Sequence, residues 1–493
     1  MSGAGHDTGR LTATLGVRTR RVVYGPVDPA GRVAELTLMS EVDQAHLLML
    51  MDTGLLPAAA GRALLRTIGE LRASGFRELT AADAPRGIYL RYEQLLVERL
   101  GDDVGGRLHT GRSRNDLQAT TTALRLRAWL LAFSQEALRL IAVLLNRARA
   151  HRDVVMPAYT HFQPAVPVTY GHYLVGVAFA AGRALRTAEA AATGLSRCPL
   201  GAGAVAGTDL PVDPEITAAL LGFSTGPVHA TDAVASRDVL LQVLAAVAGL
   251  GVVLSRLATD LQLWSTSEFG LIAFPDELVG SSSAMPQKRN AFLLEHVKAK
   301  AGAAIGAWTG AASMMKSTPF TNSIEVGTAA VDAAWPGLSA IADSVLLCQV
   351  LVSGSRPVPD RMMSRAVAGF TDATAVANDL VRRGVPFRTA HHLVGSAMRD
   401  AEAKGLSRPE SLAWPGGTGT PIPADGLAAV ASKTRHGGGP GGFEEQFRVA
   451  VAEYADHSGR LRDQRARIAR SRAELARRVG LELDAADREG QPV

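Results

Sequence analysis

Long apolar segments with helical spacing constrain the fold of this chain more than any other feature. From Ala119 to Ala150 no proline interrupts the pattern, and leucines recur at heptad spacing with small alanines between them, namely Leu124, Leu131, Leu138, Leu145, Ala128 and Ala142. A second segment, Ala233 to Ser267, is apolar on nearly every face in its middle, and a third follows Asn290. Strand signals are scarce. The sequence therefore predicts an all-α fold with a long central helical bundle.

A helix that is apolar all round needs neighbours on every side. We interpret the heptad leucines as core packing. The most apolar run, Val239 to Ser255, is short for a membrane span and contains Gln242, so we interpret it as a fully buried helix. Because a single subunit does not readily cover all these faces, the sequence favours an oligomer whose central bundle is shared.

Length and composition narrow the class of protein. With 493 residues, 47% hydrophobic and 20% charged, the chain is expected to form about three domains. The net charge of +5 comes from scattered arginines without interleaved aromatic residues, which argues against nucleic acid and suits an anionic substrate. Two distant cysteines exclude a disulfide framework or a CxxC metal site. Since the N-terminus lacks the apolar core of a signal peptide, we expect a cytoplasmic protein without membrane contact.

Breaks in the helical pattern suggest where the domains meet. A polar loop is expected at Arg114 to Ala119, and glycine and proline interrupt the pattern from Ser353 to Pro359. These breaks predict a mostly helical N-terminal domain (1–117), a bundle domain (118–358) and a smaller helical C-terminal domain (359–493). Within the last, Ala413 to Gly426 and His436 to Gly442 are expected to be loops, and the tail after Leu483 is expected to fray.

The segment GSSSAMPQKRN, Gly280 to Asn290, carries the strongest chemical signal. It combines a glycine, three serines, a cation and an amide without an apolar run. Lys288 and Asn290 supply a point charge and a directional donor for a carboxylate, and the loop is rich in free N–H groups. An ordinary solvated serine loop remains an alternative from composition alone, but the pattern is typical of an anion-binding loop.

This segment resembles the GSSxMPxKxN signature of the aspartase/fumarase superfamily, whose members release fumarate by elimination. LHTGRSRNDLQAT (Leu108 to Thr120) and YTHFQPAVPVTYGH (Tyr159 to His172) resemble blocks of argininosuccinate lyase. The resemblance continues in order from about His46 to about Gly442. The chain is therefore identified as a divergent member of the argininosuccinate lyase family. That family has a three-domain fold, assembles as homotetramers with sites shared between subunits, and requires no metal or other cofactor.

The resemblance implies a role for each matching residue. Ser282 would be the catalytic base, His161 the proton donor to the leaving group, and Glu295 the carboxylate that orients His161. The substrate anchors would be Ser113, Arg114, Asn115, Thr160, Gln163, Lys288 and Asn290. The main chemical task is to stabilise the doubly charged carboxylate that forms when the neighbouring proton is removed, which the loop amides, Lys288 and Asn290 suit. A serine base would also need nearby N–H groups and positive charge.

The chain departs from the family pattern in the segments that hold the distal part of the substrate. The usual EDxH is replaced by RGIY, ending at Tyr89, and the YNxDLQED block is replaced by TNSIEVGTA with Asn322 and Glu325. His229 stands where an asparagine is usual, and Ser281 takes the usual glycine position. We therefore treat Tyr89, Asn322 and Glu325 as specificity candidates. His109 has no family role and is interpreted as a structural hydrogen-bonding group.

Two classes of function follow. The first is a lyase that releases fumarate from an N-substituted aspartate, either a specialised paralogue or a conventional argininosuccinate lyase of arginine biosynthesis. The second is a non-catalytic structural paralogue.

Overall fold

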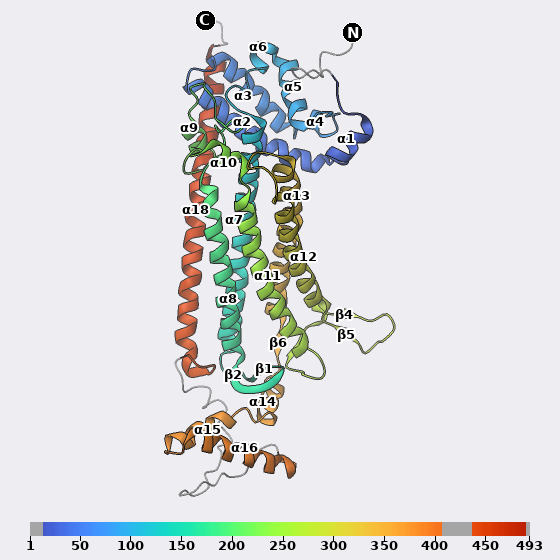
Figure 1. The fold of residues 1–493 in the computed structure, drawn as a ribbon, viewed down its shortest axis with the longest axis vertical. Helices are drawn as coiled ribbons and strands as arrows, with labels where there is room; N and C mark the ends of the chain where they lie inside the picture. Colours follow the sequence, from blue (N-terminus) through green and yellow to red (C-terminus); the bar gives the residue numbers. More distant parts are fainter. Residues whose placement is uncertain (1–12, 407–435, 490–493) are drawn as a thin grey trace.

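The computed structural model describes residues 13–406 and 436–489, and Figure 1 shows an elongated bundle of long helices with smaller helices at each end. Five long helices and α18 supply the largest core. Their bounds are α7 (Arg114–Ala150), α8 (Tyr170–Ala191), α11 (Asp238–Trp264), α12 (Phe292–Met315), α13 (Ala330–Gly354) and α18 (Pro440–Glu489). The prediction of an all-α fold with a long central bundle is confirmed.

Helix α7 begins at Arg114, five residues before the predicted start at Ala119. The expected polar loop from Arg114 to Ala119 is therefore wrong. The reason is a capping box, in which the Ser113 hydroxyl accepts from the helix backbone and the Asp116 carboxylate accepts from the backbone N–H of Ser113. The polar residues that resembled a loop thus form the first turn of the helix.

The N-terminal part packs a second hydrophobic core at one end of the bundle (Figure 1). Its helices are α1 (Val17–Tyr24), α2 (Pro29–Asp52), α3 (Ala58–Ala73), α4 (Arg77–Thr80), α5 (Ile88–Leu100) and α6 (Asp102–Gly105). Two short helices from later in the chain lie at the same end, α9 (Pro214–Leu220) and α10 (Ala230–Ala235), as Figure 1 shows. This end of the bundle also carries the start of α7.

The other end carries short strands that sequence patterns did not predict. The strands form three two-stranded antiparallel pairs, β1 (Val155–Thr160) with β2 (Gln163–Thr169), β3 (Ile272–Ala273) with β6 (Arg356–Pro357), and β4 (Gly280–Ser281) with β5 (Arg289–Asn290). In Figure 1 the loop between β4 and β5 projects sideways from the bundle. Both the β1–β2 turn and this loop carry predicted catalytic residues.

Beyond the bundle lie α14 (Pro359–Ala368), α15 (Ala373–Arg382) and α16 (Phe387–Ala403), and α15 packs on α16 through a small core of their own. Helix α18 then returns along the bundle beside α7 and α8 and reaches the N-terminal helices (Figure 1). It continues to Glu489, beyond the point at Leu483 where fraying was expected. The expected loop Ala413 to Gly426 lies outside the described residues.

Within residues 13–406 and 436–489, three helical segments are long and apolar enough to cross a membrane by length and composition alone, and they are α7, α11 and Glu325–Gly354. Within the chain only 50%, 50% and 44% of their most apolar windows are buried. Val239 to Ser255 is therefore not fully buried in one chain, since Val252 is 47% exposed. These helices carry more apolar surface than a single chain covers.

Candidate active site

The N-terminal end of α7 carries three of the predicted substrate anchors, Ser113, Arg114 and Asn115, and this group is called the anchor. Ser113 is the N-cap, and its hydroxyl accepts from the backbone N–H of Asn115 at 3.2 Å. Arg114 is exposed and makes no hydrogen bond or ion pair with any described residue. An arginine in the first helical turn lies at the positive end of the helix dipole, where a cation is unfavourable and an anion is stabilised. The positive end of the helix dipole and Arg114 therefore make this helix end suited to a carboxylate.

The glycine-rich loop Gly201 to Thr208 is tied to the same helix end. The buried Asp116 carboxylate accepts from the backbone N–H groups of Gly201 and Gly203, at 3.1 and 2.9 Å. The Asn115 amide donates to the carbonyl of Ala204 at 3.2 Å. Sequence reasoning did not single out Asp116, although its spacing from Ser113 is the signature of a capping box. Asp116 holds the loop against the anchor.

The segment Thr321 to Ala329, which carries the specificity candidates Asn322 and Glu325, lies beside the anchor as well. The Asn322 amide donates to the Asn115 side-chain oxygen at 3.0 Å. The Gln118 amide donates to the carbonyl of Gly327 at 3.0 Å, which ties α7 to the π-helical turn η3 (Glu325–Ala329). Irregular turns of this kind recur at functional sites. Glu325 is exposed at the start of that turn, so the structure brings Asn322 and Glu325 to the same end of the bundle as Arg114.

A buried polar cluster supports the loop that leads into the anchor. The Arg112 guanidinium pairs with Asp43 at 2.6 Å, and both side chains are fully buried. Arg112 also donates to the Tyr89 hydroxyl at 3.3 Å, and that hydroxyl lies 2.7 Å from Nδ1 of His109. Burial raises the pKa of the Asp43 carboxyl and of Tyr89, and the Arg112 guanidinium opposes both shifts. Tyr89 was predicted from the sequence, whereas Arg112 and Asp43 were not, because nothing in the local pattern joins them.

The predicted acid, His161, lies at the tip of the β1–β2 hairpin. Thr160 pairs with Gln163 across the two-residue turn. The turn residues His161 and Phe162 have φ of 53° and 61°, the left-handed region that favours glycine or asparagine. His161, Thr160 and Gln163 are all exposed, and Phe162 is 73% exposed. The hairpin therefore presents His161 outward, away from its own chain.

The predicted base, Ser282, lies in the loop between β4 and β5. Its hydroxyl oxygen accepts from the backbone N–H groups of Ala284 and Met285 at 3.3 and 3.1 Å. Two N–H donors aimed at one oxygen favour a negative charge there. Ser281 does not have a positive φ, so a serine fits its position without backbone strain. Lys288 is exposed in the same loop, and Asn290 pairs with Gly280 at its base.

Glu295, the predicted partner of His161, lies in the first turn of α12. It accepts from the Gln262 amide at 3.0 Å, and the other end of that amide accepts from Lys298 at 2.6 Å. In the part of the chain that the structure describes, no hydrogen bond or ion pair joins Glu295 to His161. The predicted pair is therefore not formed within one chain.

The predicted residues fall into separate groups along the bundle. The anchor residues lie at the start of α7, whereas His161 follows its C-terminal end. Since α7 has 37 residues, these groups are about 55 Å apart at about 1.5 Å per residue. The Ser282 loop projects from the side of the bundle (Figure 1). One isolated chain cannot bring the anchor and His161 to the same substrate.

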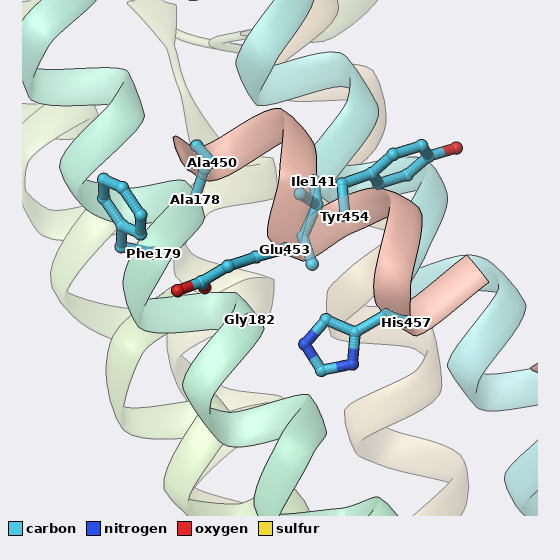
Figure 2. Close-up of a pocket in the computed structure, with 8 residues that line it drawn as sticks. All are labelled: Ile141, Ala178, Phe179, Gly182, Ala450, Glu453, Tyr454 and His457. Atoms are coloured by element: carbon cyan, nitrogen blue, oxygen red, sulfur yellow. The ribbon is translucent and has the colours of Figure 1, made fainter. Parts of the chain in front are cut away.

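A small pocket opens between α8 and α18, far from the predicted residues. Figure 2 shows Gly182 and Phe179 on one side and Glu453 and His457 on the other. The Nδ1 atom of His457 lies 2.9 Å from the Glu189 carboxylate, which ties α18 to the bundle. This pocket contains none of the candidate catalytic residues. It belongs to the packing of α18.

Comparison with known families agrees with the resemblance. Residues 82–306 match a family described as lyase, and residues 370–412 match the argininosuccinate lyase C-terminal family. The chain is 39% identical to the argininosuccinate lyase of Methanothrix thermoacetophila over 359 residues, which is 73% of each protein. It is 32% identical to argininosuccinate lyase 1 of Shouchella clausii over 367 residues, which is 74% of each.

Solved structures show the same architecture. EDDS lyase in complex with formate has a TM-score of 0.82 and 25% identity, over 97% of this chain and 98% of that one. A variant of EDDS lyase carries bound fumarate, with the same TM-score of 0.82. The class II fumarase of Schistosoma mansoni has a TM-score of 0.65 at 15% identity, over 76% of this chain and 85% of that one, which supports the fold alone.

Proposed function

Because the chain belongs to the argininosuccinate lyase family and is a fumarate-releasing lyase of the aspartase/fumarase superfamily, we propose that it acts on an N-substituted aspartate whose leaving group differs from that of argininosuccinate. Its substrate class is a small dicarboxylate. The observation that carries the proposal is the hydrogen bond of 3.0 Å from the Asn322 amide to Asn115. Through this bond a residue of the altered segment, Thr321 to Ala329, contacts the anchor at the start of α7.

The reaction begins with removal of a proton from the carbon next to a carboxylate. Ser282 takes this proton, because its oxygen already accepts from two backbone N–H groups that would stabilise the alkoxide. Electrons from the broken C–H bond move into the adjacent carboxylate, whose added charge Lys288 and Asn290 stabilise. The C–N bond then breaks, and the double bond of fumarate forms.

The departing nitrogen needs a proton, and His161 supplies it. An imidazole suits this role because its ordinary pKa lies near neutral pH. Glu295 orients the ring when a neighbouring subunit brings the two side chains together. Arg114 and the start of α7 hold a carboxylate of the succinyl half, with Ser113, Asn115, Thr160 and Gln163 completing the contacts.

The separation of these groups supports a homotetramer in which each site draws on several subunits. Apolar side chains are exposed along the central helices, including Val252 at 47%, Trp308 at 40% and Val350 at 51%. A shared central bundle would bury them and bring the start of one α7 towards another subunit's hairpin. We also propose that the enzyme is cytoplasmic.

The assembly can be tested directly. We expect light scattering at micromolar concentration to give the mass of four chains, and a monomer there would contradict the shared site. Mixing Ser282→Ala chains with His161→Asn chains should restore part of the activity, because some sites in a mixed tetramer receive both wild-type residues. Mixing two preparations of the same variant provides the control and should restore none.

The proposal of a different leaving group rests on the segment Thr321 to Ala329, which differs from the family pattern. The tyrosine and glutamine of the family pattern are absent, and Asn322, Glu325 and Gly327 occupy their segment. Asn322 is already bonded to Asn115, and the Gly327 carbonyl is bonded to Gln118. A site that lacks the hydrogen-bonding partners of a guanidinium discriminates against it by about 2 kcal/mol or more.

We therefore expect argininosuccinate to be a poor substrate, with a kcat/KM below about 10⁴ per molar per second, the lower end for ordinary enzymes. Fumarate release, followed by ultraviolet absorbance, measures this directly. A panel of other N-substituted aspartates should contain at least one that is converted faster.

The second candidate is a conventional argininosuccinate lyase. It is favoured by the names of the sequence relatives and by the exposed Glu325 carboxylate, which could meet a cationic group. A kcat/KM for argininosuccinate above the limit given would establish it. The non-catalytic alternative loses its support, because the family and its relatives are lyases.

A further inference from the structure

A chain of hydrogen bonds leads from the buried core of the N-terminal helices to the partly exposed side chain of His109. His109 lies on the loop that runs into Ser113 and Arg114. Two contacts from α2 hold this loop, the ion pair of Asp43 with Arg112 and a 2.8 Å contact of His46 Nε2 with the carbonyl of Thr110. The loop is thus rigidly supported on its inner side.

The direction of each hydrogen bond follows from the chemistry of the groups. Arginine can only donate, so the Tyr89 oxygen accepts from Arg112. Among the described residues the structure records no other acceptor for the Tyr89 hydroxyl, so its proton is directed to Nδ1 of His109, 2.7 Å away. A neutral imidazole that accepts at Nδ1 carries its proton at Nε2. Glu93 lies 3.9 Å from Nδ1, too far for a hydrogen bond that would favour the other tautomer.

The surroundings also keep His109 neutral. Burial, together with the charges of Arg112 and Arg114, lowers the pKa of His109 to about 4. The ring is therefore uncharged at neutral pH, and its side chain is 34% exposed. His109 thus offers an accessible, neutral N–H donor. It lies four residues before Ser113, the N-cap of α7, and the first turn of α7 carries the unpaired Arg114.

We propose that His109 is a substrate-binding residue whose Nε2–H donates to the carboxylate held at the start of α7, and that Tyr89 and Arg112 are positioning residues that set its tautomer. Tyr89 occupies the histidine position of the family's EDxH pattern, and its hydroxyl hydrogen-bonds to His109 on the loop before Ser113. The inference rests on the fumarate-releasing activity, and it does not depend on the identity of the leaving group, because fumarate itself serves as the probe.

The test compares two substitutions at one position. In glutamine the Nε2 amide reaches the place of the imidazole Nε2, whereas the shorter asparagine reaches only the place of Nδ1. We expect His109→Asn to raise the Kd for fumarate, measured by calorimetry on the assembled enzyme, about tenfold, the effect of one hydrogen bond to a charged group. His109→Gln should recover most of that affinity. Tyr89→Phe should weaken binding about threefold to tenfold, because the tautomer is no longer fixed.

The two types of role give different patterns. For a binding contact, His109→Asn raises KM for a turned-over substrate more than it lowers kcat, and adding Tyr89→Phe causes little further loss. Assembly mass and thermal unfolding verify that each variant is folded. Equal losses for His109→Asn and His109→Gln in folded tetramers would overturn the donor role. An unchanged Kd for fumarate in His109→Asn would also overturn it.

Discussion

Replacing Ser282 by alanine is expected to lower kcat by at least about a thousandfold while leaving the fold intact. The hydroxyl is the proposed base, and the mostly exposed loop that carries it contributes little to the core. The backbone N–H groups of Ala284 and Met285 would remain, but without an oxygen to stabilise. Fumarate release at saturating substrate measures the effect.

A matched control is available in the same loop. Gln287 is exposed, stands at a variable position of the GSSxMPxKxN signature, and has no side-chain hydrogen bond recorded among the described residues. Gln287→Ala should therefore retain activity within about twofold, as surface substitutions usually do. A folded Ser282→Ala enzyme with near-normal turnover would mean that another residue removes the proton.

His161→Asn is expected to lower kcat by about a hundredfold, and Glu295→Gln by a smaller factor, on substrates with a poor leaving group. Protonation of the leaving nitrogen is then needed in the transition state. Since Glu295 acts by orienting His161, the double variant should be little worse than His161→Asn alone. The measurement is kcat for both single variants and the double variant.

The size of the loss should also follow the acidity of the leaving group. A good leaving group needs less help from an acid, so His161→Asn should harm its release less. Glu277→Gln removes an exposed carboxylate outside the proposed pair and serves as the control. If the double variant showed the full product of the single losses, the two residues would act independently and the proposed pair would be wrong.

Local patterns were sufficient for the helical class. Apolar periodicity depends only on neighbouring residues, and it correctly indicated the long helices and the central bundle. The role proposed for the Gly280 to Asn290 loop came from its resemblance to the superfamily signature, because its residue types alone are also those of a solvated serine loop. The start of α7 was also encoded locally, in the capping box of Ser113 and Asp116, although the polar residues around it were taken for a loop.

The β1–β2 hairpin shows where local patterns misled. Its turn residues, His161 and Phe162, adopt positive φ although neither is glycine or asparagine. Such a turn contradicts residue preference and is held by strand pairing on both sides. The return of α18 along the bundle is another case, because nothing in its sequence names the helices that it packs against.

In the candidate site, too, some features could be predicted from the sequence and others depend on the tertiary structure. The sequence alone selected the residues that are proposed to carry the chemistry, because Ser282, Lys288, Arg114 and His161 are recognised by their neighbours in the chain. Tertiary structure alone decided that the buried Asp43 and Arg112 hold Tyr89 against His109, and that α7 separates the anchor from His161 by its full length. The physical reason is that side-chain contacts depend on distances in space, and residues far apart in sequence carry no local mark of one another.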